Sequence, residues 1–128
     1  MRLLLDTHVL LWAVAASRRL PKSTRALLLD EENEVFYSAA SVWEMSIKAS
    51  LRRSDFKIDV EEFHASLPQA AFSELAVRSV HTVAVSKLPP VHRDPFDRIL
   101  VAQAMLEPLV RLTNDVILTK YPAPVRMI

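Results

Sequence analysis

None of the 128 residues of this chain is glycine. Proteins contain about 7% glycine on average, and several ligand-binding loops need it because only glycine allows the backbone to turn that sharply or to approach a phosphate that closely. Its absence excludes the phosphate-binding loop of nucleotide hydrolases, the dinucleotide-binding fingerprint and the nucleophile elbow of serine hydrolases. The chain also lacks cysteine, which excludes disulfides, thiolate metal sites and a cysteine nucleophile.

The composition is that of one globular domain. Hydrophobic residues make up 51% of the chain and charged residues 24%, which are ordinary values for a folded protein. The formal net charge of +1 argues against an extended phosphate-binding surface, although a local basic patch stays compatible with it. We therefore expect a single domain that spans residues 1–128.

The amino-terminal segment does not predict export or membrane insertion. Its longest apolar run covers residues 9–16, whereas a transmembrane helix needs about 20 residues. Arg2 and the small residues 15–17 imitate parts of a signal peptide, but Asp6 and His8 interrupt the apolar region. We expect a cytoplasmic protein with no membrane segment.

Short apolar runs alternate with segments of helical periodicity along the chain. Strands are expected at 3–5, 35–37, 72–77, 109–112 and 125–128, and helices at 9–16, 21–28, 42–51, 59–67, 79–88 and 95–106. The clearest boundary is Asp94-Pro95, an acceptor for free amide groups followed by a proline at the first helical position. This alternation predicts an α/β fold, with a short, mostly parallel central sheet of about five strands and helices on both faces.

Acidic residues follow two of the predicted strands. Asp6 comes directly after the first strand and Asp115 shortly after the fourth. Ligands of open parallel sheets bind at the carboxyl ends of the strands, so these carboxylates meet on one rim if the two strands are neighbours. Glu44 and Asp97 lie early in the helices that could bring them to the same rim.

Asp97 also lies on the apolar stripe of its helix, in line with Leu100, Val101 and Ala104. A buried carboxylate needs a cation or hydrogen-bond donors, and crowded carboxylates attract a hard metal ion such as Mg²⁺ or Mn²⁺. The histidines show no zinc-binding spacing and are interpreted as incidental, and only His92 lies near the acidic motifs. They are His8, His64, His81 and His92.

Each acid also fits an ordinary structural role. Asp94 fits a helix cap better than a metal ligand, because a proline follows it. The remaining roles are a helix cap for Asp6, an ion pair with Lys48 for Glu44, a capping box for Asp97 and a turn with Asn114 for Asp115. The combination of acids, and no single one of them, points to a metal site.

Four segments of the chain carry recognisable motifs: LLLDTHVLLW at 3–12, SAASVWEMSIK at 38–48, HRDPFDRILVAQA at 92–104, and LTND at 112–115 with the closing YPAPV. With these segments the chain resembles PIN-domain ribonucleases, and more closely the VapC-type toxins of bacterial type II toxin–antitoxin pairs. The segments occur in the family's order across the whole chain. Arg52-Arg53-Ser54 and Pro122-Ala123 stand where relatives often have glycine, which leaves the substrate preference open.

The resemblance implies a PIN-like three-layer fold and a metal-dependent endoribonuclease that uses Mg²⁺, with Mn²⁺ as a substitute. It assigns metal binding and catalysis to Asp6, Glu44, Asp97 and Asp115. The hydroxyl of Thr113 would support these acids. Asp94 would either cap its helix or lie next to the metal ligands without binding the metal itself.

The resemblance also implies partners. It predicts an RNA substrate, a VapB-type antitoxin that neutralises the toxin, a homodimer and a hetero-oligomer with the antitoxin. Such a toxin inhibits translation and growth. Candidate RNA contacts are Lys48, Arg93 and Arg98, together with a basic loop that contains Arg52, Arg53 and Lys57.

Two other classes stay open. A PIN-fold module without catalysis would keep the fold and the partner surface. A receiver-type phosphoacceptor domain shares a parallel sheet with acids at its strand ends, but it needs paired acids after the first strand, and only Asp6 is present there.

Overall fold

The computed structural model describes residues 1–51 and 57–128. Its strands are β1 (Arg2–Leu5), β2 (Glu34–Ser38), β3 (Ser73–Leu75), β4 (Val110–Thr113) and β5 (Val125–Met127). Its helices are α1 (Thr7–Val14), α2 (Lys22–Leu29), α3 (Ala39–Ser50), α4 (Val60–Ser66), α5 (Ser79–Val85) and α6 (Pro95–Leu106), with short 3₁₀ helices η1 (Leu67–Ala70) and η2 (Val116–Lys120). The alternation predicted from the sequence is confirmed.

The five strands form one parallel sheet in the order β3-β2-β1-β4-β5. β1 lies at the centre, and its residue Leu4 is in register with Phe36 of β2 and Arg111 of β4. From β1 the chain builds outward through β2 to β3, and it then returns to the other side of β1 for β4 and β5. The order of the strands therefore reverses between β1 and β4.

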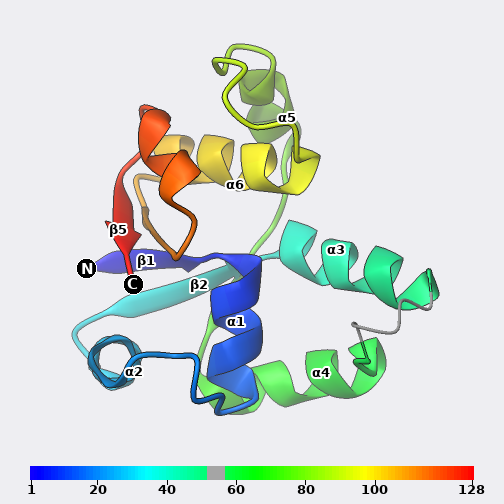
Figure 1. Ribbon diagram of the computed structural model, residues 1–128, viewed down its shortest axis with the longest axis vertical. Coiled ribbons are helices and arrows are strands. Elements are labelled where there is room, and N and C mark those ends of the chain that lie inside the picture. Colours follow the sequence, from blue (N-terminus) through cyan, green and yellow to red (C-terminus); the bar gives the residue numbers. More distant parts are fainter. Residues whose placement is uncertain (52–56) are drawn as a thin grey trace.

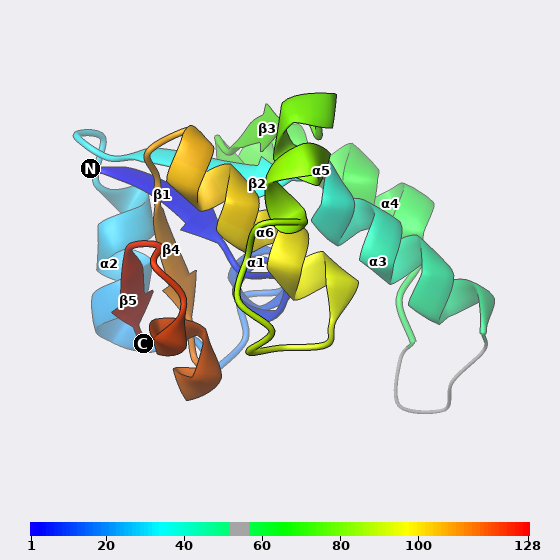
Figure 2. The ribbon, with the colours of Figure 1, turned by 90° about the horizontal axis from the view of Figure 1, so that it is seen from above.

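Helices cover both faces of the sheet (Figure 1). Seen from above, α6 lies across the middle of one face (Figure 2), and α5 packs on α6. The opposite face carries α1 and α2. Parallel strands are stable in this setting because helices shield both of their faces from water. The predicted three-layer α/β fold is confirmed.

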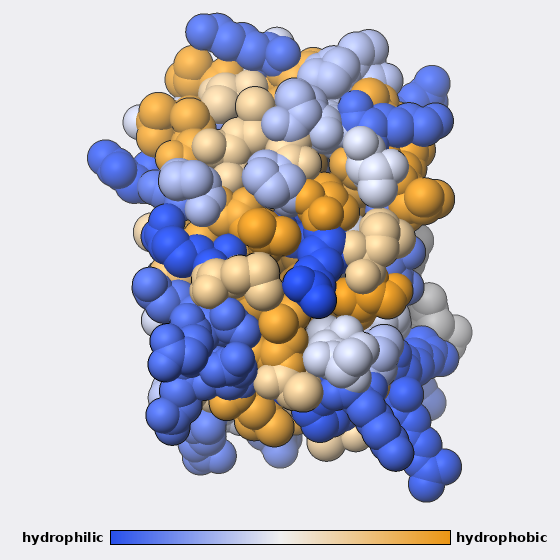
Figure 3. Space-filling model, turned by 90° about the vertical axis from the view of Figure 1, so that its left-hand side faces the viewer, coloured by the Kyte–Doolittle hydropathy of each residue, from blue (hydrophilic) through white to orange (hydrophobic). Residues whose placement is uncertain are grey.

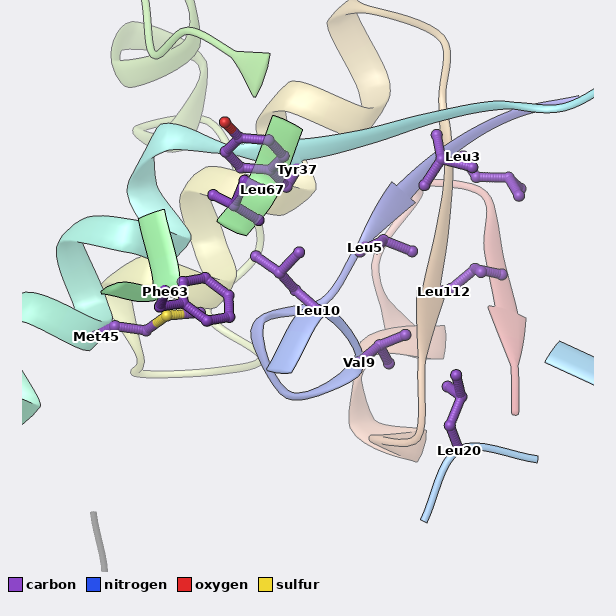
Figure 4. Packing of buried hydrophobic residues seen from close by; sticks show 11 residues of the cluster. Leu3, Leu5, Val9, Leu10, Leu20, Tyr37, Met45, Phe63, Leu67 and Leu112 are labelled. Atoms are coloured by element: carbon purple, nitrogen blue, oxygen red, sulfur yellow. The ribbon is translucent and has the colours of Figure 1, made fainter. Parts of the chain in front are cut away.

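Successive residues of β1 supply the two faces of the core. Leu3 and Leu5 pack with Val9 and Leu10 of α1 (Figure 4), whereas Leu4 packs on the other face with Leu100 of α6. All these side chains are fully or almost fully buried. The period of two along a strand therefore decides which side chains of β1 and β4 point toward α6.

Side-chain caps fix several helix starts and correct some predicted limits. Asp6 caps α1 and Ser38 caps α3, so both helices begin earlier than their apolar periodicity indicates. Asp94 caps α6, which begins and ends as predicted. Ser41 lies inside α3, where its hydroxyl accepts a hydrogen bond of 2.9 Å from Thr7.

Two alanines adopt the left-handed conformation that usually selects glycine. Ala16 has φ 51° and Ala71 has φ 59°, and they follow α1 and η1. This conformation costs an L-residue about 1–2 kcal/mol. The absence of glycine is thus accommodated by strain at two chain reversals.

The side of the molecule that bears both termini mixes hydrophobic and hydrophilic residues, and its lower part, over α2, is mostly hydrophilic (Figure 3). Within the described residues, no helix combines the length and the apolar character that crossing a bilayer requires.

Candidate active site

The reversal of strand order places a crevice at the carboxyl ends of β1 and β4. In open α/β sheets such a reversal is where ligands bind, because the chain leaves the two strands in opposite directions. Asp6 directly follows β1, and Asp115 follows β4 by two residues. Asp97 reaches the crevice from the first turn of α6.

All four predicted metal-binding acids line one pocket of about 500 Å³. We call it the acidic pocket. Its lining comprises Asp6, Thr7, His8, Trp12, Arg19, Glu44, Lys48, Asp94, Asp97, Asn114 and Asp115. The structure therefore brings together the residues that the sequence singles out from four separate segments.

Asp6 is almost fully buried, with 4% of its surface exposed. Its Oδ1 accepts hydrogen bonds from the Thr7 amide at 2.9 Å and from Arg111 Nη2 at 2.8 Å. Its Oδ2 accepts from the Thr113 hydroxyl at 2.5 Å. Asp6 is thus a helix cap and a member of the acidic pocket at once, and Thr113 supports it as the resemblance implies.

Arg111 joins Asp6 to Asp97. Its side chain is 1% exposed, and Nη2 lies 2.8 Å from Asp6 Oδ1 and 2.6 Å from Asp97 Oδ1. Nη1 donates to the backbone carbonyl of Asp97 at 2.9 Å. Arg111 is in register with Leu4 of β1, which packs with Leu100 of α6. Side chains in register on neighbouring strands share a face of the sheet, and this direction brings the Arg111 guanidinium to the first turn of α6.

The pKa values of the two acids that contact Arg111 are shifted in opposite directions. Burial by itself raises the pKa of Asp6, but the Arg111 charge and the hydrogen bonds from Thr113 and Arg111 outweigh it and bring that pKa below its usual value. Burial raises the pKa of Asp97, the attraction of Arg111 opposes this only in part, and the negative charge of Asp6 adds to the rise. Of these two carboxylates, Asp97 is therefore the one whose negative charge Arg111 does not fully offset, as expected where acids crowd together.

Glu44 and Lys48 form the ion pair that the spacing of four residues suggests. Lys48 Nζ lies 2.8 Å from Glu44 Oε2. The pair is not a surface pair, however, because Glu44 is 6% exposed. Both residues line the acidic pocket, so the structural and the functional roles of Glu44 hold together.

Asp115 is the most accessible of the four acids, with 40% of its side chain exposed. Its Oδ1 accepts a hydrogen bond from the Ile117 amide at 3.1 Å, and its own amide donates to the Thr113 hydroxyl at 3.0 Å. The predicted turn is thus a cap of η2.

His92 is not incidental. Its Nε2 lies 3.2 Å from Asp97 Oδ2 and 3.6 Å from Asp115 Oδ2. Its Nδ1 accepts a hydrogen bond of 3.1 Å from the Asp94 amide, so the neutral ring carries its proton on Nε2. In this tautomer, Nε2 of His92 faces the two carboxylates as a hydrogen-bond donor.

Asp94 acts as the predicted helix cap. One of its oxygens accepts from the amides of Phe96 at 2.8 Å and Asp97 at 3.2 Å. These bonds hold the first turn of α6 and thereby the direction from which Asp97 enters the acidic pocket.

The predicted RNA-binding residues are placed unequally. Lys48 lines the acidic pocket and Arg93 is exposed. Arg98 donates instead to backbone carbonyls on the segment between α5 and α6, those of Val85 at 3.1 Å and Pro89 at 3.0 Å among them. Lys57 lines a different pocket, and Arg52 and Arg53 lie outside the described residues.

The donor set of the acidic pocket suits a hard divalent cation. Its converging groups are carboxylate oxygens, and the oxygens of Asp97 and Asp115 that face His92 lie within 4.8 Å of its ring nitrogen and of each other. Oxygen ligands of this kind are preferred by Mg²⁺ and Mn²⁺. The pKa of Asp97 is raised, and the positive charge of a bound cation would lower it again.

The chain is thus a parallel α/β domain with carboxylates gathered where the strand order reverses. A comparison with models of protein families matches residues 3–124 to the PIN domain. The chain therefore belongs to the PIN domain family.

Several solved structures share the fold. A crystal structure of VapBC2 from Rickettsia felis, bound to a DNA fragment from its promoter, has a TM-score of 0.75 at 16% identity, covering 99% of this chain and 98% of the other. DNA-bound VapBC from Salmonella typhimurium gives 0.71 at 14% identity, with 99% and 98% covered. FitAB bound to an IR36 DNA fragment gives 0.71 at 19%, with 98% and 94% covered. A search of curated protein sequences finds no match.

Proposed function

We propose that this protein is a metal-dependent endoribonuclease and the toxin of a toxin–antitoxin pair. The observation that carries the proposal is the convergence of Asp6, Glu44, Asp97 and Asp115 in one pocket at the carboxyl ends of β1 and β4. Membership of the PIN domain family supports nuclease chemistry.

The four acids would hold Mg²⁺, or Mn²⁺ in its place, through their carboxylate oxygens. A bound ion of this kind polarises a phosphate and lowers the pKa of a water molecule that attacks it. Asp6 and Asp97 are held in position by Arg111. Asp115 is the most exposed acid and would meet solvent water first. The Nε2 proton of His92 would donate to an oxygen near Asp97.

The acidic pocket also contains groups that suit a single strand of RNA. Lys48 and Arg19 supply positive charge for phosphates. His8 and Trp12 form an aromatic pair with ring centroids 6.2 Å apart, and unpaired bases stack on such rings. We leave Arg98 out of the proposed RNA surface because backbone carbonyls occupy its guanidinium.

The solved structures with the same fold are complexes named VapBC and FitAB. We infer from them that this chain too binds a small VapB-type antitoxin, forms a hetero-oligomer with it and acts in the cytoplasm, where it inhibits translation.

The expected homodimer has one candidate surface. Trp43 is 62% exposed and borders an apolar pocket of about 450 Å³ between α3, α5 and α6. Leu51 is exposed as well.

The alternative of a receiver-type domain is not favoured. Flavodoxin-like folds, to which receivers belong, have the strand order 2-1-3-4-5, whereas this sheet has the order β3-β2-β1-β4-β5.

The test is cleavage of structured and unstructured RNAs by the purified, antitoxin-free protein. We expect cuts with Mg²⁺ or Mn²⁺ and none with excess chelator. A folded protein that neither binds these ions nor cuts any RNA would contradict the proposal and favour a module without catalysis.

A further inference from the structure

The proposed function leaves open how many metal ions the acidic pocket holds. Catalysis by two ions requires a pair of cations about 3.5–4 Å apart. Carboxylates that lie between the two ions have to bridge them. The contacts of Arg111 bear on whether such a bridge can form here.

Arg111 Nη2 occupies the position between the two most buried aspartates of the pocket. This single nitrogen lies 2.8 Å from one oxygen of Asp6 and 2.6 Å from one oxygen of Asp97. The remaining oxygen of Asp6 accepts the Thr113 hydroxyl. Both oxygens of Asp6 therefore already have donors, and the guanidinium stands where a cation shared by Asp6 and Asp97 would stand.

The charges of the pocket agree with this geometry. The pocket holds five carboxylates, because Asp94 lines it together with the four predicted metal-binding acids. Three side-chain cations stand against them: Arg111 pairs with Asp6 and Asp97, Lys48 pairs with Glu44 at 2.8 Å, and Arg19 lines the pocket. Two negative charges remain, which one divalent ion neutralises.

We propose that Arg111 replaces one cation of the carboxylate cluster, so that the acidic pocket binds a single divalent ion. The inference rests on the proposed function, in that it specifies how the same site holds its metal. The ion would take Asp97 Oδ2, since Arg111 contacts the other oxygen of Asp97, and Asp115 Oδ2, both of which lie near His92 Nε2. Arg111 is thus a positioning residue, which acts on the metal through Asp6 and Asp97.

The orientation of the buried Arg111 side chain is set by the two aspartates. Arg111 is fully buried, and its Nε has no hydrogen-bond partner among the described residues. Its two terminal nitrogens nevertheless reach both aspartates and the carbonyl of Asp97. The orientation thus satisfies the acids at the expense of the guanidinium's own hydrogen bonding.

The experiment counts bound ions by titrating the full chain with Mn²⁺ and following free Mn²⁺ by electron paramagnetic resonance, without RNA. We expect about one Mn²⁺ for each wild-type chain, the number that balances the remaining charge. Two ions, or none, bound by the folded wild-type protein would overturn the proposal.

Three variants test whether Arg111 sets this number. Arg111→Met removes the charge at similar length and is expected to bind a second Mn²⁺, which should also raise its melting temperature more than it raises that of the wild type. Arg111→Lys keeps a positive charge and should keep one ion. Arg126→Met, on the neighbouring strand β5, is the matched control and should also keep one ion.

The outcomes separate the inference from the proposed function. One bound ion in both the wild type and Arg111→Met would show that Arg111 does not replace a second cation, whether or not the protein cleaves RNA. If Arg111→Met fails to fold, the wild-type number still decides, because two ions bound beside an intact Arg111 contradict the proposal. One bound ion together with no cleavage of any RNA would refute the nuclease and leave the inference standing.

Discussion

Replacing Arg111 by methionine gives the sharpest prediction for stability. Arg111 is buried and is the cation that both Asp6 and Asp97 contact. Removing one partner of a buried ion pair leaves an uncompensated charge and costs about 3–5 kcal/mol. Since domains of this size are stable by about 5–15 kcal/mol, we expect the Arg111→Met variant to keep the fold at a strongly reduced free energy of unfolding.

The pH dependence of this loss distinguishes a charge effect from a packing effect. In the wild type the pKa of Asp6 is lowered, so its contribution to stability is present above the unfolded pKa of about 3.9 and is lost as the pH falls through the lowered value. Without Arg111, burial raises the pKa of Asp6, and that of Asp97 rises further. Their protonation then favours the folded state, and the variant gains stability as the pH falls through the raised values.

The assay is urea unfolding of the wild type and the variant at about pH 8 and about pH 5, because a raised pKa makes these carboxylates take up protons at a higher pH than usual. The difference in unfolding free energy should be smaller at the lower pH. Arg126→Met, an exposed arginine on β5, serves as the control and should change stability by less than about 0.5 kcal/mol. A difference for Arg111→Met that does not depend on pH would refute the electrostatic account.

Three further predictions concern single contacts. Thr113→Val leaves Asp6 Oδ2 and the Asp115 amide without their partner and should cost about 1–3 kcal/mol in urea unfolding; an unchanged midpoint would contradict the role of the hydroxyl. Arg98→Met should destabilise by at least about 1.5 kcal/mol without altering the salt dependence of RNA binding; a smaller salt slope would return Arg98 to the RNA surface. Ala71→Gly relieves a positive φ and should stabilise the protein by about 1 kcal/mol; a loss of stability would show that no strain is stored there.

Much of the fold is predictable because local and global signals agree. The apolar runs are short, the helix caps stand at their starts, and Pro95 fixes the first turn of α6. The limits of some elements were less predictable. The segment 72–77 is strand only at Ser73–Leu75, and the helix from Ser79 ends at Val85 rather than at residue 88. Edge strands and helix ends depend on tertiary contacts that the sequence pattern does not contain.

The four acids were found from their positions after strands and early in helices, but Arg111 was missed. Its signal was present in the sequence, since a charged residue stands between Val110 and Leu112 in an apolar strand. In a parallel sheet covered on both faces such a residue is buried and needs a partner of opposite charge. That argument requires knowing that β4 lies beside β1, which became available only with the strand order.

The contacts of His92 were not predictable either. Its ring reaches Asp97 and Asp115 because the segment before α6 folds back over the acidic pocket, with the His92 amide donating to the Tyr121 hydroxyl at 2.8 Å. The separations of Asp97 and Asp115 from His92 along the sequence match neither the helical nor the strand period. The periodicity of the sequence therefore does not predict these contacts.

The central claim is that the carboxylates of the acidic pocket cleave RNA with a bound metal ion, and Asp115 tests it most directly. Asp6→Asn should also abolish cleavage, but Asp6 caps α1 and contacts Arg111, so its replacement disturbs the fold. Asp115 is the most exposed of the four acids. The account predicts that Asp115→Asn keeps the unfolding midpoint of the wild type and loses RNA cleavage in Mg²⁺ by at least about 100-fold, while Glu31→Gln, an exposed acid in the loop after α2, cleaves like the wild type. A folded Asp115→Asn protein that cleaves RNA at the wild-type rate would contradict the account.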